Sequence, residues 1–251
     1  LRFHAVIWPA MLMAAGIDIP KKVFAHGWLL VGGEKMSKSK LTGIAPSDIT
    51  DHFGVDAFRY YFLRAIPFGT DGSFSWEDMS ARYTSELAND FGNLASRLAA
   101  MIEKYCGGKI PAVAQDEGLA EALKTTVEKA DAAMVALDFQ GGINAVMDYC
   151  KKVNGFVTEK EPWILAKDPA NQATLEAVLY NTAESLRALA VLLHPVMPAT
   201  TEILWEALGA NAALGAIGSQ EISKVATWGQ LPEGATVTKT PVLFPRLEVK
   251  E

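Results

Sequence analysis

The first apolar pattern of the chain has the repeat of a helix. Residues 3–15 are mostly apolar, and Phe3, Ile7 and Met11 recur at four-residue spacing, which places them on one helical face. Pro9 lies within this run, so the helix must begin near it or bend at it. The pattern therefore predicts a helix at the start of the chain, with these three residues on one face.

A strand and a second helix are predicted next. Residues 23–31 form a continuous apolar run rich in β-branched and aromatic residues, as in a covered parallel sheet. Ser47 followed by acidic residues predicts the N-cap of a helix. The turn-rich stretch 67–76 then breaks the pattern, and we place a domain boundary near residue 80.

Beyond this boundary the sequence is helical and rich in alanine. Short connections between successive helices predict an antiparallel bundle. A looser tail, residues 219–251, ends in an apolar segment that we expect to dock on the body. The fold class is thus α/β followed by all-α, with domains 1–80 and 81–218 and the tail 219–251. The predicted helices of the second part are 78–105, 117–137, 140–160, 170–193 and 198–208.

Composition excludes several classes of protein. The chain has 251 residues, of which 50% are hydrophobic and 21% charged, as in ordinary globular proteins. No apolar run approaches the roughly 18 residues of a membrane span. Cys106 and Cys150 form no CxxC pair, which argues against a disulfide framework or a metal site in this segment and favours the cytoplasm. The start, residues 1–4, lacks Met and a signal-peptide layout, which indicates a chain cut within a fold.

The net charge of −6 does not indicate general affinity for nucleic acid. Residues 1–84 carry 9 basic and 8 acidic side chains, whereas residues 85–251 carry 14 basic and 21 acidic side chains. If the second part binds RNA, it must therefore use a local patch and contacts to bases.

Three lysines and two serines lie together in residues 35–40, on a predicted loop after the strand. Such a loop could be a solvated basic turn. Its ammonium groups also suit a polyphosphate, and ligands of open α/β sheets bind at the ends of strands.

A polar stripe marks the first helix of the second part. Asn89, Asn93 and Arg97 are four residues apart, so they lie within about 80° on a helical wheel, away from the neighbouring leucines. The stripe could be a solvated polar face. Amide and guanidinium groups also suit unpaired RNA bases, because they can hydrogen-bond to base edges and the guanidinium can stack on base faces.

Several of these stretches resemble one enzyme family. Lys35-Met36-Ser37-Lys38-Ser39 matches the KMSKS signature of class I aminoacyl-tRNA synthetases, although Gly43 comes later than the glycine that often follows the signature. The flanking sequence resembles methionyl-tRNA synthetases. Residues 89–97 match their N-x-x-x-N-L-x-x-R element, which recognises the CAU anticodon, and residues 161–163 resemble their second anticodon element.

The resemblance implies roles for individual residues. It implies that Lys35 and Lys38 are catalytic. It also implies that the whole signature binds ATP, together with His26 and Gly27. His4 and Trp8 would line the methionine pocket. The anticodon-binding residues would be Asn89, Asn93, Arg97, Pro162 and Trp163.

The implied fold is the end of a Rossmann-type catalytic domain followed by an anticodon-binding bundle. The implied activity is ligation of methionine to tRNA(Met) through methionyl-adenylate, with ATP and Mg²⁺ as substrate. The HIGH motif of the family is absent from the sequence, so we expect the chain alone to be inactive. Alternatives are a synthetase for leucine, isoleucine, valine or cysteine, a non-catalytic tRNA-binding module, and a nucleotidyltransferase of related fold.

Overall fold

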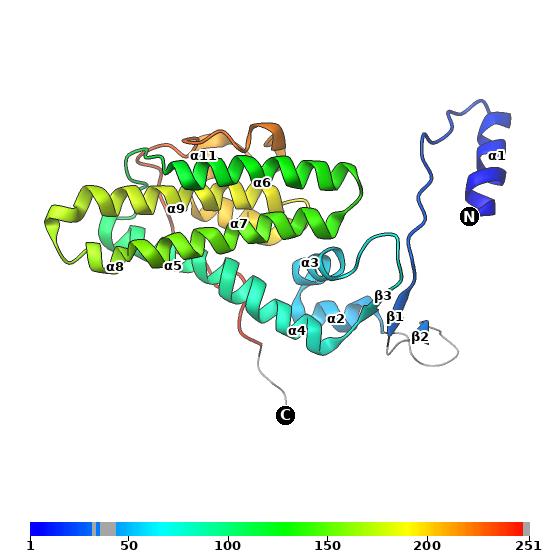
Figure 1. Ribbon diagram of the computed structural model, residues 1–251, viewed down its shortest axis with the longest axis horizontal. Helices are drawn as coiled ribbons and strands as arrows, with labels where there is room; N and C mark the ends of the chain where they lie inside the picture. The colour runs from blue at the N-terminus through cyan, green and yellow to red at the C-terminus, as the bar shows by residue number, and fades with distance from the viewer. Residues whose placement is uncertain (32–33, 36–43, 248–251) are drawn as a thin grey trace.

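The computed structural model describes residues 1–31, 34–35 and 44–247. Figure 1 shows a small sheet region that adjoins a larger helical region, with the first helix set apart from both. The first part contains α1 (Trp8–Ala14), β1 (Leu29–Val31), β2 (Glu34–Lys35), α2 (Pro46–Phe53), α3 (Val55–Ala65), β3 (Gly72–Phe74) and α4 (Trp76–Arg82). The second contains α5 (Asn93–Cys106), α6 (Glu117–Val135), α7 (Phe139–Lys160), α8 (Pro162–Leu165), α9 (Gln172–Leu193), α10 (Pro198–Ala207) and α11 (Ala210–Leu214).

The predicted N-terminal helix forms, but none of its residues is buried. A π-helix at Phe3–Ile7 leads directly into α1, and Pro9 lies in the first turn of α1, where its missing N–H group is tolerated. The side chains of Phe3, Ile7 and Met11, which share one helical face, are exposed.

The predicted strand is much shorter than its apolar run. Of residues 23–31, only Leu29–Val31 pair as β1. The sheet has the order β2-β1-β3, in which β1 is parallel to β3 and antiparallel to β2. The prediction of a long strand in a parallel sheet was thus wrong over most of its length, because an apolar run does not form a strand without a neighbouring strand to pair with.

The predicted N-cap of α2 was wrong by two residues. Ala45 is the N-cap, Pro46 is the first helical residue, and the Ala45 N–H group donates to Asp48 Oδ2 at 3.0 Å. Proline fits the first helical position because its fixed φ suits the helix. This preference places Ser47 inside the helix, where its side chain cannot cap it.

The glycine at position 27 brings the segment before β1 close to the loop before β3. A Cβ atom on Gly27 would overlap the Thr70–Asp71 peptide. Next to it, the Trp28 N–H group donates to Asp71 Oδ1 at 2.7 Å, and the Gly72 N–H group donates to the Trp28 carbonyl at 2.9 Å. The close approach that requires glycine here is therefore an approach to the chain's own backbone.

Helix α3 is bonded on two sides to the helical region. On one side, Asp56 Oδ2 accepts the Thr200 N–H group of α10 at 2.6 Å, and Arg59 donates to the Pro195 and Val196 carbonyls at 2.8 and 2.9 Å. These contacts join segments more than 130 residues apart in the sequence.

On its other side, α3 contacts a π-helix that follows α4. The Tyr60 hydroxyl donates to Glu86 Oε2 at 2.5 Å, and Arg64 pairs with Glu86 Oε1 at 3.1 Å. Arg82 also pairs with Glu86 Oε1, at 3.3 Å. Because Glu86 is buried, these three donors are needed to balance its desolvation.

One continuous helical run, Trp76–Cys106, corresponds to the predicted helix 78–105. It consists of α4, the π-helix Tyr83–Gly92 and α5, and it ends at Gly107 in the left-handed conformation. Periodicity predicted the run and its end but not the π-helix within it. The run continues without a break past residue 80, so the boundary proposed there falls inside a helix.

Helix α9 lies at the centre of the helical region. Every residue from Val178 to Leu193 is buried, and the helix packs against α5, α6, α7 and α10. A helix that is covered on all sides must also bury its polar residues. Glu184 and Arg187 form an ion pair of 2.9 Å with 0% and 1% of their side chains exposed.

The buried ion pair holds the tail that was predicted to dock on the body. Arg187 donates to the Val225 and Thr227 carbonyls at 2.9 and 3.3 Å. The Glu184 carboxylate accepts the N–H groups of Gln230 and Leu231 at 3.1 and 3.0 Å. Backbone groups of the tail therefore complete the solvation of both charges.

Loss of the Glu184 charge should destabilise the fold strongly. Glu184→Gln leaves Arg187 buried and unpaired, so we expect the free energy of unfolding to fall by about 3 kcal/mol or more. The matched control is Glu221→Gln, which breaks the exposed pair with Lys224 at the same three-residue spacing and should cost less than about 1 kcal/mol. Urea unfolding followed by circular dichroism measures both, and equal changes would contradict the assigned role.

Substitution of Gly27 by alanine should destabilise the fold, whereas the same change in an exposed helix should stabilise it. Gly27→Ala should cost roughly 1–3 kcal/mol through overpacking against the Thr70–Asp71 peptide. Gly155→Ala, on α7 with open space around it, should stabilise by about 0.5–1 kcal/mol. We expect hydrogen exchange at the Trp28 and Gly72 amides to become faster in Gly27→Ala but not in Gly155→Ala. Unchanged exchange at these amides in Gly27→Ala would refute the packing argument.

Candidate functional site

The lysine signature falls mostly outside the described residues. The backbone of Lys35 pairs with Leu30 as part of β2, so the prediction of a loop was wrong for this residue. Met36, Ser37, Lys38 and Ser39 lie outside the described part of the chain. Their proposed roles at ATP thus rest on sequence alone.

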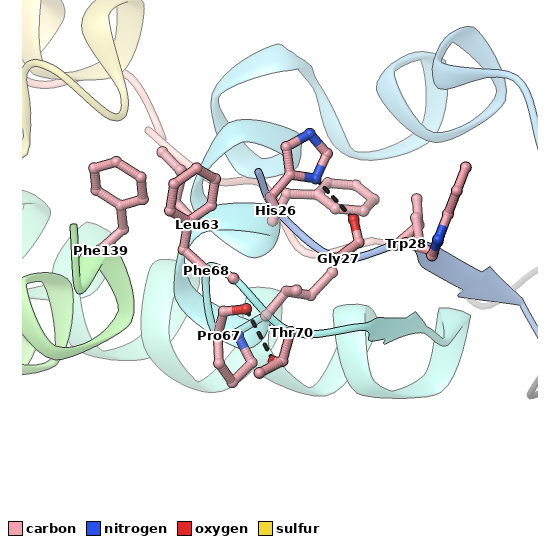
Figure 2. A pocket seen from close by; sticks show the side chains of 12 residues that line it. His26, Gly27, Trp28, Leu63, Pro67, Phe68, Thr70 and Phe139 are labelled. Carbon is pink, nitrogen blue, oxygen red and sulfur yellow. Dashed lines mark hydrogen bonds between the residues drawn. The ribbon is translucent and has the colours of Figure 1, made fainter. Parts of the chain in front are cut away.

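A pocket of about 250 Å³ contains the two other residues assigned to ATP, His26 and Gly27. Figure 2 shows these residues with Phe68 and Phe139 around the same space. The His26 ring stacks on Phe68 with centroids 5.9 Å apart, and His26 Nδ1 donates to the Gly27 carbonyl at 2.7 Å. Most of the remaining lining is apolar and aromatic, which suits a flat ring system better than a phosphate group.

The pocket lies between the two regions of the molecule. Phe68, in the loop after α3, contacts Phe139, the first residue of α7, at a centroid distance of 4.8 Å. Phe24 also stacks on Phe68, with ring centroids 4.7 Å apart. This aromatic row connects the segment before β1 to the helical region.

The two residues assigned to methionine are not part of this pocket. His4 is exposed and contacts the ring of Phe3, and Trp8 is 40% exposed. Both belong to the helices at the N-terminus, which Figure 1 shows separated from the sheet by an extended segment. The structure therefore does not bring His4 and Trp8 together with His26 and Gly27.

The predicted polar stripe lies on the surface, as its spacing required. Asn89 and Asn93 are exposed and Arg97 is half-buried, whereas Phe91 and Leu94 are buried. Asn89 belongs to the π-helix and Asn93 is the first residue of α5. A π-helix within a longer α-helical run often marks a functional site, and here it carries the first residue of the stripe.

Two of the predicted anticodon residues meet in space although they are far apart in sequence. Helix α7 ends at Lys160, its C-cap Glu161 has the left-handed conformation, and Pro162 begins α8. This turn leaves Trp163 36% exposed, with the Arg97 guanidinium 5.4 Å from the centre of its ring. A cation over an indole face is attractive, and it brings Arg97 beside a flat aromatic surface.

One residue of this surface was missed from the sequence. The Asn154 side chain, on α7, donates to the Asp90 carbonyl at 3.0 Å and to the Cys150 carbonyl at 3.2 Å. It thereby holds the π-helix that carries Asn89 against the helix that leads to Trp163. Asparagine is disfavoured inside helices, and that was the only signal in the sequence.

Two features are absent from the part of the chain that the structure describes. Within them, no helix is both long and apolar enough to span a membrane. The same residues contain no group of three or more His, Cys, Asp or Glu side chains placed to hold a metal ion.

Two known families match the chain. Residues 1–99 match the family described as tRNA synthetases class I (M), and residues 116–238 match the anticodon-binding domain of tRNA ligase. The chain is 62% identical to the methionine–tRNA ligase of Streptomyces coelicolor and 43% identical to that of Halalkalibacterium halodurans, in both cases over the whole chain. It spans 48% and 38% of the length of these two relatives.

Solved structures agree with the sequence matches. Mycobacterium tuberculosis methionyl-tRNA synthetase in complex with methionyl-adenylate matches 98% of this chain with a TM-score of 0.85 and 35% identity. The apo form of that protein matches with a TM-score of 0.80 and 32% identity. In each case, 48% of the solved chain is covered. The chain belongs to the methionyl-tRNA synthetase family of class I aminoacyl-tRNA synthetases and corresponds to the C-terminal portion of its longer members.

Proposed function

We propose that this chain is the part of a methionine–tRNA ligase that carries the lysine signature and the anticodon-binding surface. The activity would be ATP-dependent ligation of methionine to tRNA(Met) through methionyl-adenylate, in the cytoplasm. The observation that carries the proposal is the meeting of Arg97 with Trp163 beside the exposed Asn93. The family of the relatives supports it.

The exposed surface has the chemistry to read unpaired bases. A base of the CAU anticodon could stack on the exposed indole of Trp163, which the turn at Pro162 holds in place. The amides of Asn89 and Asn93 can both donate and accept hydrogen bonds, as base edges require. Arg97, already beside the indole, would add a donor or a phosphate contact. The net negative charge of residues 85–251 makes such local contacts necessary.

The catalytic part of the proposal concerns the first 80 residues, which would be the end of a Rossmann-type domain. Lys35 and Lys38 would meet the phosphates of ATP, which enters with Mg²⁺, and would stabilise charge on the departing pyrophosphate. His26 and Gly27 would lie on the adenosine side, in agreement with the apolar and aromatic pocket around them. His4 and Trp8 would line the methionine pocket only if the N-terminal helices move toward that pocket.

The remaining parts of the proposal are the domain limits. Residues 81–218 would form the antiparallel anticodon-binding bundle, and residues 219–251 the tail. A non-catalytic tRNA-binding module is the second candidate, because all the residues assigned to the anticodon lie in the helical part of the chain. Anticodon binding without any dependence on the lysine signature would favour it.

Binding of an RNA stem-loop tests the anticodon assignment. The chain should bind a CAU stem-loop more tightly than one with a single changed anticodon base. Asn93→Ala and Trp163→Ala should each weaken binding by about 1–3 kcal/mol, as measured for lost base contacts. Asn211→Ala, an exposed asparagine on α11, is the control and should change nothing. Equal affinity of the wild-type chain for both RNAs would undo the assignment.

Pyrophosphate exchange tests the catalytic assignment. The 251 residues alone should give no methionine-dependent ATP–pyrophosphate exchange, because they lack the HIGH motif. In a protein of the relatives' full length, Lys38→Ala should slow exchange by roughly 10²–10³-fold, the usual effect of losing one transition-state donor. Asn93→Ala should leave exchange unchanged, since the reaction needs no tRNA. Appreciable exchange by the 251 residues alone would be inconsistent with this account.

A further inference from the structure

A second pocket, of about 230 Å³, lies directly beside the asparagine pair. Asn89, Asn93 and Ser96 line it from the π-helix and α5. Its volume is below the roughly 300–1,000 Å³ of sites for drug-sized ligands. The pocket therefore has room for part of a nucleotide rather than for a separate small molecule.

The opposite wall of this pocket comes from the C-terminal tail. Val242, Phe244 and Arg246 line it from that side. More than 140 residues separate the two walls in the sequence, and only the docked tail brings them together. Arg246 is exposed, so its guanidinium is accessible to a ligand in the pocket.

Specific contacts fix the tail at this position. Phe244 is 6% exposed and packs edge-to-face against Tyr83, with ring centroids 5.8 Å apart. The Tyr83 hydroxyl donates to the Pro245 carbonyl at 2.8 Å, one residue before Arg246. Gly92 faces the same contact, and a Cβ atom on it would lie at an ordinary contact distance of 3.8 Å from the Phe244 ring.

We propose that the docked tail is part of the RNA-binding site and that Arg246 contacts a backbone phosphate of the nucleotides read by Asn89 and Asn93. The inference rests on the proposed function. Guanidinium groups bind phosphate oxygens in a bidentate manner. Arg97 already lies over Trp163 on one side of the asparagine pair, and Arg246 supplies a cation on the other. Because the helical part of the chain is negatively charged overall, a backbone phosphate requires such a cation nearby.

The salt dependence of RNA binding distinguishes a phosphate contact from a base contact. For Arg246→Gln we expect about tenfold weaker binding of the CAU stem-loop. The slope of log affinity against log salt concentration should fall by roughly 0.7–1. The preference for CAU over the changed anticodon should stay the same, because a phosphate carries no sequence information. Arg246→Lys, which keeps the charge, should restore most of the slope.

Lys239→Gln is the matched control, because it removes one positive charge from the same tail. Lys239 is exposed and lines a groove against α10 instead, so the variant should keep the wild-type affinity and slope. Two results would overturn the inference while leaving the anticodon assignment intact. The first is an unchanged salt-dependence slope in Arg246→Gln, and the second is an equal loss of RNA affinity in Arg246→Gln and Lys239→Gln. In both cases the wild-type chain must still prefer CAU. A wild-type chain that does not prefer CAU would refute the proposed function itself.

Discussion

The arrangement of the molecule depends on the two sets of polar contacts that hold α3. Asp56 and Arg59 bind backbone groups where α9 gives way to α10, and Tyr60 and Arg64 bind Glu86 on the π-helix. All of these contacts join the sheet region to the helical region. Since a buried polar group without its partner costs about 1–3 kcal/mol, α3 cannot shift by one turn without losing several of them. The pocket of His26 and Gly27, which α3 helps to line, and the asparagine surface therefore have a defined geometric relation.

Helix α7 connects the two candidate sites along its length. It begins at Phe139, which lines the pocket of His26 and Gly27, and its 22 residues span about 33 Å at 1.5 Å per residue. Near its end, Asn154 holds the Asp90 carbonyl, and Trp163 follows in α8. The tail adds the last wall beside Asn89. Three segments distant in sequence thus form one surface, and the Glu184–Arg187 pair retains the tail among them.

Sequence reasoning succeeded where the signal was local. The stripe of Asn89, Asn93 and Arg97 follows from helical spacing, and the helix predicted over residues 78–105 ends within one residue of that limit, before the left-handed Gly107. It failed where the outcome depended on distant partners. The run 23–31 has the composition of a strand, yet Trp28 is 63% exposed and only three residues pair. The cation–π contact between Arg97 and Trp163, the bond from Asn154 and the pocket wall at Arg246 have no periodic signature, because packing between segments creates them.

We propose that the surface formed by α5, the π-helix before it and α8 recognises the CAU anticodon. The most direct measurement is a nuclear magnetic resonance titration of the chain with a CAU stem-loop, following the side-chain amides of Asn89 and Asn93 and the indole N–H of Trp163. Variants at the three positions assign these signals. The account predicts that all three shift together, and that they shift less with an RNA carrying one changed anticodon base. Shifts confined to other surfaces, such as the groove between α6 and α7, would contradict it.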